Sequence, residues 1–174
     1  MADESTNGQG AGGDGQGSAA QKAPQNLGVL AQYVKDLSFE NPGAPQSLRG
    51  RTGNPNINIT INVQPGPMNG EEVEVELKLD VKATSGNEVL FAIELAYAGL
   101  FRLTNIPPEA VQPIIRIECP RLLFPFARQI VADASRNGGF PPLLIDPIDF
   151  VALYRQRLME AQAAAQRQGG GQLA

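Results

Sequence analysis

Strict alternation of apolar and charged residues is the clearest pattern in the chain. Odd positions hold Val73, Val75, Leu77, Leu79, Val81 and Ala83, and every even position from Glu72 to Lys82 is charged. Because side chains point to opposite faces along a strand, this segment predicts a strand with one apolar and one ionic face. A turn at residues 84–87 precedes a second apolar run, residues 89–101, so the two segments predict an antiparallel hairpin.

Two earlier segments predict strands of the same sheet. Residues 27–40 place Leu27, Val29, Ala31, Tyr33, Leu37 and Phe39 on one face, which Lys35 interrupts, and residues 56–63 alternate polar side chains with Ile57, Ile59, Ile61 and Val63. The apolar odd face of all four strands is therefore expected to be covered by helices. The even face is expected to point outward, and it collects Asp36, Glu40, Glu72, Glu74, Glu76, Asp80 and Glu94 against Lys78 and Lys82.

After Thr104 the apolar residues recur at helical spacing. Pro107-Pro108-Glu109 predicts the start of a short helix that Pro113 interrupts. A longer helix is expected from Cys119 to the stop signal at residues 137–139, with Pro125 bending it or confining its regular part to the C-terminal half. Its apolar positions are Cys119, Leu122, Leu123, Phe126, Ile130, Val131 and Ala134.

An apolar connection at residues 140–145 leads to a last helix, for which Asp146 is the expected N-cap and Pro147 the first helical residue. Strands followed by helices predict an α+β fold, a four-stranded antiparallel sheet with helices packed on one face. We expect one domain over residues 26–162. Residues 1–25 and 163–174 are rich in Gly, Gln and Ala, so they are expected to be disordered tails.

Composition excludes several classes of function. The 174 residues include no histidine and one cysteine, so imidazole-based catalytic triads and thiolate–imidazole zinc sites cannot be built within the chain. No cofactor or metal is expected. The net charge of −4 argues against nucleic acid as a partner. The absence of a secretory signal, of a membrane-spanning apolar run and of a disulfide framework points to the cytoplasm.

Three features are candidates for function, each with a simpler structural alternative. The acidic even face is either a solvated sheet surface or a docking site for a basic partner; catalysis by Asp36 and Glu94 as an acid–base pair is disfavoured. Cys119, at a helix start, is expected to be a small buried residue and not a reactive thiol. The apolar run at residues 140–145 is either a lid over the core or the wall of a hydrophobic groove.

Three segments resemble the SecB export chaperones. They are KDLSFENP at residues 35–42, CPRLLFPFAR at residues 119–128 and GGFPPLLIDPIDFVALY at residues 138–154. The resemblance covers residues 27–160. It implies a cytoplasmic, ATP-independent chaperone that binds unfolded secretory precursors in surface grooves and delivers them to the SecA motor. It also implies a homotetramer, a dimer of dimers with helices between outer sheets, and no direct insertion into a membrane.

The resemblance also implies roles for particular residues. The SecA-docking positions fall on Asp36, Glu40, Ala92 and Glu94 of the even face. Candidates for the client groove are Phe140, Leu143, Leu144, Ile145 and Tyr154, with Ile57 and Ile59. The assembly and core face comprises Ile93, Leu95, Tyr97, Leu122, Phe126 and Ile130.

Two departures from the family pattern concern these surfaces. Ala92 stands where the family often has leucine, and residues 51–55 lack a tryptophan that many members carry. Two other functions are kept as alternatives. One is a SecB-like chaperone for other clients, such as a toxin–antitoxin system, and the other is a small acid–base enzyme that uses outward carboxylates.

Overall fold

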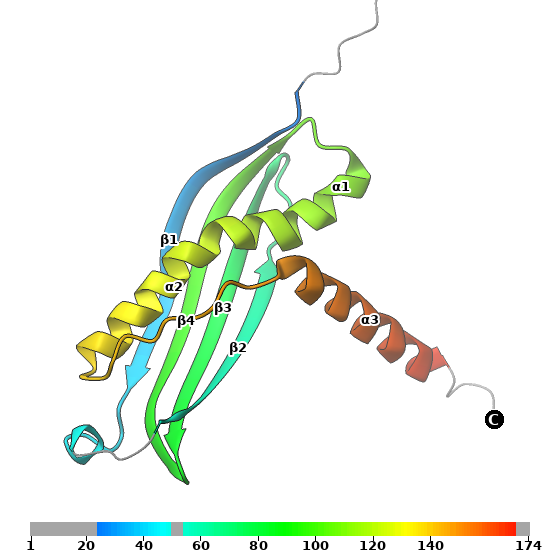
Figure 1. Cartoon of the computed structure of the whole chain (residues 1–174). Helices are drawn as coiled ribbons and strands as arrows, with labels where there is room; N and C mark the ends of the chain where they lie inside the picture. Colours follow the sequence, from blue (N-terminus) through cyan, green and yellow to red (C-terminus); the bar gives the residue numbers. More distant parts are fainter. Residues whose placement is uncertain (1–23, 50–53, 170–174) are drawn as a thin grey trace, which may run out of the picture.

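The computed structural model describes residues 24–49 and 54–169. The expected N-terminal tail lies outside these residues except for its last two positions, and so do residues 50–53 and 170–174. The strands are β1 (Asn26–Glu40), β2 (Asn56–Pro65), β3 (Glu72–Ser85) and β4 (Glu88–Thr104). They form one antiparallel sheet in the order β1-β4-β3-β2, which Figure 1 shows as a long, curved layer.

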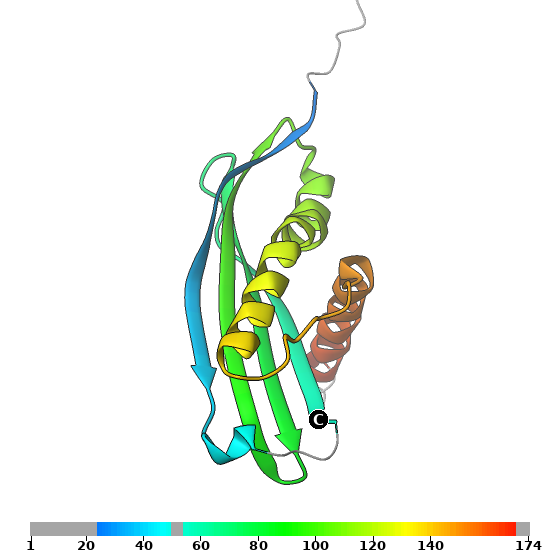
Figure 2. The same cartoon turned by 60° about the vertical axis from the view of Figure 1, so that its left-hand side comes forward.

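Helices cover one face of this sheet, as the sequence predicts. They are α1 (Pro108–Pro113), a π-helical turn η2 (Ile114–Glu118) and α2 (Cys119–Asn137), whereas α3 (Phe150–Gly169) contacts mainly η2 and extends away from the sheet (Figure 1). A 3-10 turn, η1 (Gln46–Leu48), follows β1. Figure 2 views the sheet from its side and shows the three helices together on the same side of it. The four-stranded α+β architecture is therefore confirmed.

The alternation in β3 produces the core. Its odd residues Val73, Val75, Leu77, Leu79, Val81 and Ala83 are all buried. They pack with Ile93, Leu95 and Phe101 of β4 and with Leu123, Ala127 and Val131 of α2. Gly99 allows α2 to come this close, because a Cβ there would lie 2.8 Å from Leu123 Cδ2.

The outer face of β4 carries mainly small residues. Ala96 and Ala98 are buried although they point away from the helices. The reason is the register: Ala98 pairs with Tyr33 of β1 and Glu76 of β3, and Ala96 pairs with Asp36 and Lys78. Long side chains from the two flanking strands therefore meet across β4.

β1 does not follow the uninterrupted alternation that was expected. Its register with β4 shifts between Val29 and Ala31 and again between Val34 and Asp36. Each bulge adds one residue and reverses which face later residues occupy. Ala31 and Tyr33 consequently pair with outward residues of β4, so their expected place on the helix-covered face is wrong. Beyond the second bulge, Asp36 returns to the predicted outward parity.

The helices depart from expectation at their boundaries. An α-helix does end at Pro113, but the chain continues through η2 directly into α2. Pro125 lies inside α2 without confining the helix to its C-terminal half. Asp149, and not Asp146, caps α3: its Oδ1 accepts a hydrogen bond from the Ala152 backbone at 3.0 Å. α3 then runs to Gly169, seven residues beyond the expected end of the domain.

Candidate functional site

Four acidic residues gather at one end of the outer sheet face. In the register of the sheet, Glu94 of β4 lies between Ser38 of β1 and Asp80 of β3. Asp36 and Glu40 lie two residues to either side of Ser38, ~13 Å apart along the strand at ~3.3 Å per residue. Within the described residues, no lysine or arginine nitrogen lies within 4.0 Å of these carboxylates. We call Asp36, Glu40, Asp80 and Glu94 the acidic patch.

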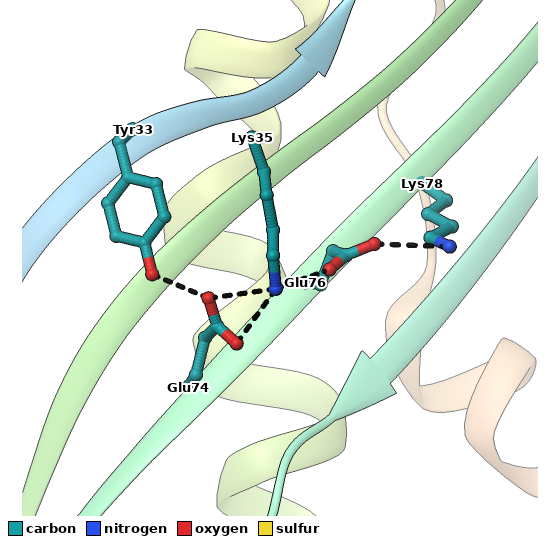
Figure 3. A network of polar contacts seen from close by, with 5 residues as sticks. All are labelled: Tyr33, Lys35, Glu74, Glu76 and Lys78. Carbon is teal, nitrogen blue, oxygen red and sulfur yellow. Dashed lines mark hydrogen bonds and ion pairs between the residues drawn. The ribbon is translucent and has the colours of Figure 1, made fainter.

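The acids at the other end of the same face are neutralised. Lys35 Nζ lies 3.0 Å from Glu74 Oε2 and 3.1 Å from Glu76 Oε2, and Lys78 Nζ lies 3.2 Å from Glu76 Oε1. Tyr33 donates its hydroxyl to Glu74 Oε1 at 2.5 Å. Figure 3 shows these five side chains bridging from β1 to β3. Separately, Arg102 pairs with Glu72 at 2.6 Å.

The ionisation of this network follows from its hydrogen bonds. Those from Tyr33 and Lys35 hold the pKa of Glu74 below its usual 4.5, because they favour the charged carboxylate. The hydrogen bonds of Lys35 to Glu74 and Glu76 raise its own pKa above 10.5. The bond to Glu74 raises the pKa of Tyr33 above 10.0. Glu74 and Lys35 therefore carry opposite charges over the neutral pH range.

The outer face is thus divided, where the sequence suggests a uniform acidic surface. Lys35 was assigned by parity to the apolar face, but the first bulge of β1 reverses the parity, so that Lys35, the extra residue of the second bulge, reaches Glu74 and Glu76. Glu72, Glu74 and Glu76 consequently add little net negative charge. Asp80 belongs to the acidic patch because it lies directly opposite Glu94 in the β3–β4 hairpin. The register of the predicted hairpin could have identified this neighbour from the sequence.

An apolar pocket of about 430 Å³ opens on the helix side of the sheet. We call it the crossover pocket, because the connection between α2 and α3 forms one wall. Its lining comprises Asn54, Pro55, Ile57, Leu90, Phe91, Phe140, Pro141, Pro142 and Leu143. Phe140 packs against Phe91 with ring centroids 4.7 Å apart. Within the described residues, no charged side chain lines this pocket, which suits an apolar ligand.

The predicted groove residues separate in the structure. Ile57, Phe140 and Leu143 meet in the crossover pocket, whereas Leu144 is 65% exposed and points elsewhere. Ile145 is buried in the core, so the expectation that it offers groove surface is corrected. Ile59 is half-buried against the core, and Tyr154 lines a different pocket between β2 and α3.

A buried serine holds the wall of the crossover pocket in place. Ser135 of α2 donates its hydroxyl to the Ala132 carbonyl at 3.0 Å and accepts a hydrogen bond from the Leu143 backbone at 2.8 Å. The second bond links the connection to the helix before it. Ser135 was not singled out in the sequence, because a serine within an apolar helix carries no distinguishing pattern.

A second apolar surface remains open on β1 and α2. It comprises four large hydrophobic residues that are exposed, Val34, Leu37, Leu122 and Phe126. Phe126 stacks on Tyr97 with centroids 6.4 Å apart. We call these four residues the β1–α2 surface. Of the other predicted assembly and core residues, Ile93, Leu95 and Tyr97 are buried and Ile130 packs partly on the core.

The remaining candidates offer no chemistry. Burial raises the pKa of the Cys119 thiol to about 12, so it stays protonated and unreactive, as the sequence predicts. No group of three or more acidic or cysteine side chains in the described part of the chain is placed to hold a metal ion. None of the described helices is long and apolar enough to cross a membrane.

Comparison with known proteins shows the family of the chain. The family described as "Preprotein translocase subunit SecB" matches residues 20–161. The chain is 57% identical over 153 residues to the protein-export protein SecB of Rhodopseudomonas palustris (strain TIE-1), covering 88% of this chain and 98% of that one. It is 58% identical to the corresponding protein of Bradyrhizobium sp. (strain BTAi1), covering 88% and 94%.

The chain belongs to the SecB family. It is a protein-export chaperone and not an enzyme, and the expected cytoplasmic location agrees with membership of this family. The solved Mycobacterium tuberculosis Rv1957 SecB-like chaperone, in complex with a peptide from an antitoxin, has the same fold, with a TM-score of 0.56 and coverage of 70% of this chain and 87% of that one. At 11% identity this likeness concerns the fold alone.

Proposed function

We propose that this SecB-family chain holds unfolded secretory precursors in the crossover pocket, without ATP, and releases them to the SecA motor at the acidic patch. The observation that carries the proposal concerns the two faces of the sheet. Among the described residues, one face has an apolar pocket without a charged side chain in its lining, and the other has an acidic patch without a lysine or arginine nitrogen within 4.0 Å. Apolar client side chains that enter the pocket lose contact with water, which contributes ~25 cal/mol per Å² buried. Binding of this kind depends on apolar character more than on sequence.

The crossover pocket is tested by a pair of neighbouring substitutions. Leu143 lines the pocket and Leu144 does not. We expect Leu143→Ser to weaken binding of an unfolded precursor several-fold in a fluorescence titration without nucleotide. Leu144→Ser is the matched control, because it removes the same side chain from an exposed position. If Leu143→Ser and Leu144→Ser bind the precursor with equal affinity, the crossover pocket is not the client-binding site.

The acidic patch is the proposed docking surface for SecA, through Asp36, Glu40 and Glu94, with Ala92 as its apolar element. Ala92 pairs with Glu40 and Lys82, so it lies within the same surface. Exposed carboxylates without cations of their own attract a basic partner and accelerate its approach.

A charge reversal tests this docking surface. We expect Glu94→Lys to reduce SecA affinity at least tenfold, measured by titration at low salt. Glu109→Lys is the control, because it makes the same charge change on α1, away from the outer face. If Glu94→Lys and wild type bind SecA equally, the acidic patch is not the docking site.

The β1–α2 surface supports a further element of the proposal, assembly into a homotetramer as a dimer of dimers. Four large apolar residues on two adjacent elements form a surface that a second copy of the chain would cover. Several pockets on one assembly would bind one long client at several points, which raises the overall affinity. The toxin–antitoxin alternative is not favoured, since the high identities are to export proteins and the SecB-like chaperone shares only the fold.

A further inference from the structure

Two lysines form a positive border beside the acidic patch on the outer face of the sheet. Lys35 of β1 and Lys78 of β3 both reach the carboxylate of Glu76, with Nζ–Oε distances of 3.1 and 3.2 Å. Lys35 Nζ also lies 3.0 Å from Glu74 Oε2. Figure 3 shows the two ammonium groups on either side of Glu76. We call Lys35 and Lys78 the lysine border.

The lysines, and not the acids beneath them, are what a partner meets at this end of the face. The side chain of Glu76 is 13% exposed, whereas those of Lys35 and Lys78 are 46% and 41% exposed. Hydrogen bonds to Glu74 and Glu76 raise the pKa of Lys35, so its ammonium group stays charged at neutral pH. A cationic group that approaches Glu76 therefore meets two positive charges first.

Two alanines of β4 allow the lysine border to form. In the register of the sheet Ala96 pairs with Lys78, and Ala98 pairs with Glu76. Both alanines are buried, and neither has a side chain long enough to separate the flanking strands. The side chain of Lys35 therefore crosses β4 and reaches the carboxylates of β3.

The lysine border adjoins the acidic patch directly. A hollow of about 400 Å³ on the outer face is lined by both lysines and by three members of the patch, and its lining comprises Lys35, Asp36, Glu76, Lys78, Asp80, Glu94, Leu95 and Ala96. Lys78 precedes Asp80 by two residues on the same face of β3, which is ~6.6 Å at ~3.3 Å per residue. The boundary between positive and negative surface therefore falls across this hollow.

A basic partner is treated differently on the two sides of this boundary. At the lysine border it would have to displace Lys35 from two carboxylates, which exchanges one cation for another, and like charges that meet across an interface cost free energy. At the acidic patch no lysine or arginine nitrogen in the described part of the chain lies within 4.0 Å of the carboxylates, so no cation has to be displaced. Attraction on one side and repulsion on the other both favour a single position of the partner.

We propose that Lys35 and Lys78 are specificity-determining residues for docking, because they repel a basic partner from Glu74 and Glu76 and so fix its position on the acidic patch. This inference rests on the proposed docking of SecA and adds the residues that determine where on the sheet the partner lies. Without the lysine border the negative surface extends along β3, so the partner binds at more than one position. Its dependence on Glu94 then falls while its overall affinity at low salt rises.

Charge reversal of Glu94 in four backgrounds tests this role. The affinity for SecA is measured by titration at low salt, with and without Glu94→Lys, in wild type, Lys35→Gln/Lys78→Gln, Lys35→Arg/Lys78→Arg and Lys82→Gln. The arginine variant keeps both positive charges. Lys82→Gln is the control, because it removes a lysine from the same face of β3 that forms no ion pair within 4.0 Å among the described residues. Circular dichroism checks that each variant is folded.

In wild type, Glu94→Lys should weaken SecA binding about tenfold or more, and the loss should be the same in the arginine variant and in Lys82→Gln. In Lys35→Gln/Lys78→Gln we expect a loss of about threefold or less, since the partner moves toward Glu74 and Glu76. The full loss in this variant as well, or an equally reduced loss in Lys82→Gln, overturns the inference and leaves the proposed docking site intact. If Glu94→Lys has no effect in wild type, the docking proposal and the inference fail together.

Discussion

Truncation of Phe126 tests whether the β1–α2 surface holds subunits together. This side chain is 52% exposed in the subunit. An aromatic side chain presents about 200 Å², so about 100 Å² remains open to a partner. At ~25 cal/mol per Å², covering that area contributes about 2.5 kcal/mol to the free energy of association for each copy of Phe126. A two-fold interface contains two copies, which gives about 5 kcal/mol as an upper estimate.

Phe126→Ala should therefore raise the dissociation constant of the assembly by at most about 3.6 orders of magnitude. The effect within one subunit is smaller, since the loss is mainly the stacking on Tyr97, worth about 0.5–1.5 kcal/mol. Sedimentation velocity from nanomolar to micromolar concentration measures the change, with circular dichroism as the check on folding. Met159→Ala, at a side chain that is 63% exposed on α3, is the control.

Two results would refute this reasoning. The first is a Phe126→Ala protein that assembles as wild type does across the whole concentration range. The second is a wild-type protein that sediments as a monomer at micromolar concentration, because the β1–α2 surface would then have no partner copy.

Three further predictions concern the body of the domain. Ser135→Ala leaves the Leu143 N–H without its acceptor, so we expect a loss of about 1–3 kcal/mol in the free energy of unfolding and weaker client binding, measured by denaturation and peptide titration. Gly138→Ala places a Cβ 2.0 Å from the Phe39 ring, so thermal denaturation should show a loss of about 1–3 kcal/mol. The depressed pKa of Glu74 stabilises the fold above about pH 4.5, and this contribution is lost as the pH falls through the lower pKa of the folded state. Denaturation between pH 3 and 6 should therefore show that the free energy of unfolding of Glu74→Gln depends less on pH than that of wild type.

The sheet could be predicted from sequence wherever the alternation was uninterrupted. β3 alternates without a break, and each of its odd residues from Val73 to Ala83 is buried. β1 carries apolar residues at both parities, including Leu30 and Val34, and this mixture is the sequence sign of the two bulges. Period-two counting takes no account of inserted residues, so the places of Ala31 and Tyr33 were wrong.

Helix boundaries were less predictable, because several residues offered the same signal. Asp146-Pro147 and Asp149 are both suitable helix starts, and only the path of the connection selects Asp149. Pro125 lies in the second turn of α2 and lacks an N–H, so the helix loses one hydrogen bond there. The burial of Leu123 and Phe124 offsets this loss, and the helix continues through the proline. The pockets depend on contacts between distant segments, and local patterns carry no such information.

The two bulges of β1 explain how one strand serves two surfaces of different character. Without them, Tyr33 and Lys35 would face the helices, and Glu74 and Glu76 would remain unneutralised on the outer face. With them, Lys35 confines the unpaired negative charge to the acidic patch. The same shifts turn Val34 inward beside Tyr97, where it joins the β1–α2 surface. Deleting Lys35, the extra residue of the second bulge, would leave Val34 opposite Tyr97 and Asp36 opposite Ala96. We therefore expect the deletion, like Lys35→Gln, to expose the charge of Glu74 and Glu76 without moving the acidic patch or the β1–α2 surface; loss of assembly in the deletion variant alone would contradict this reasoning.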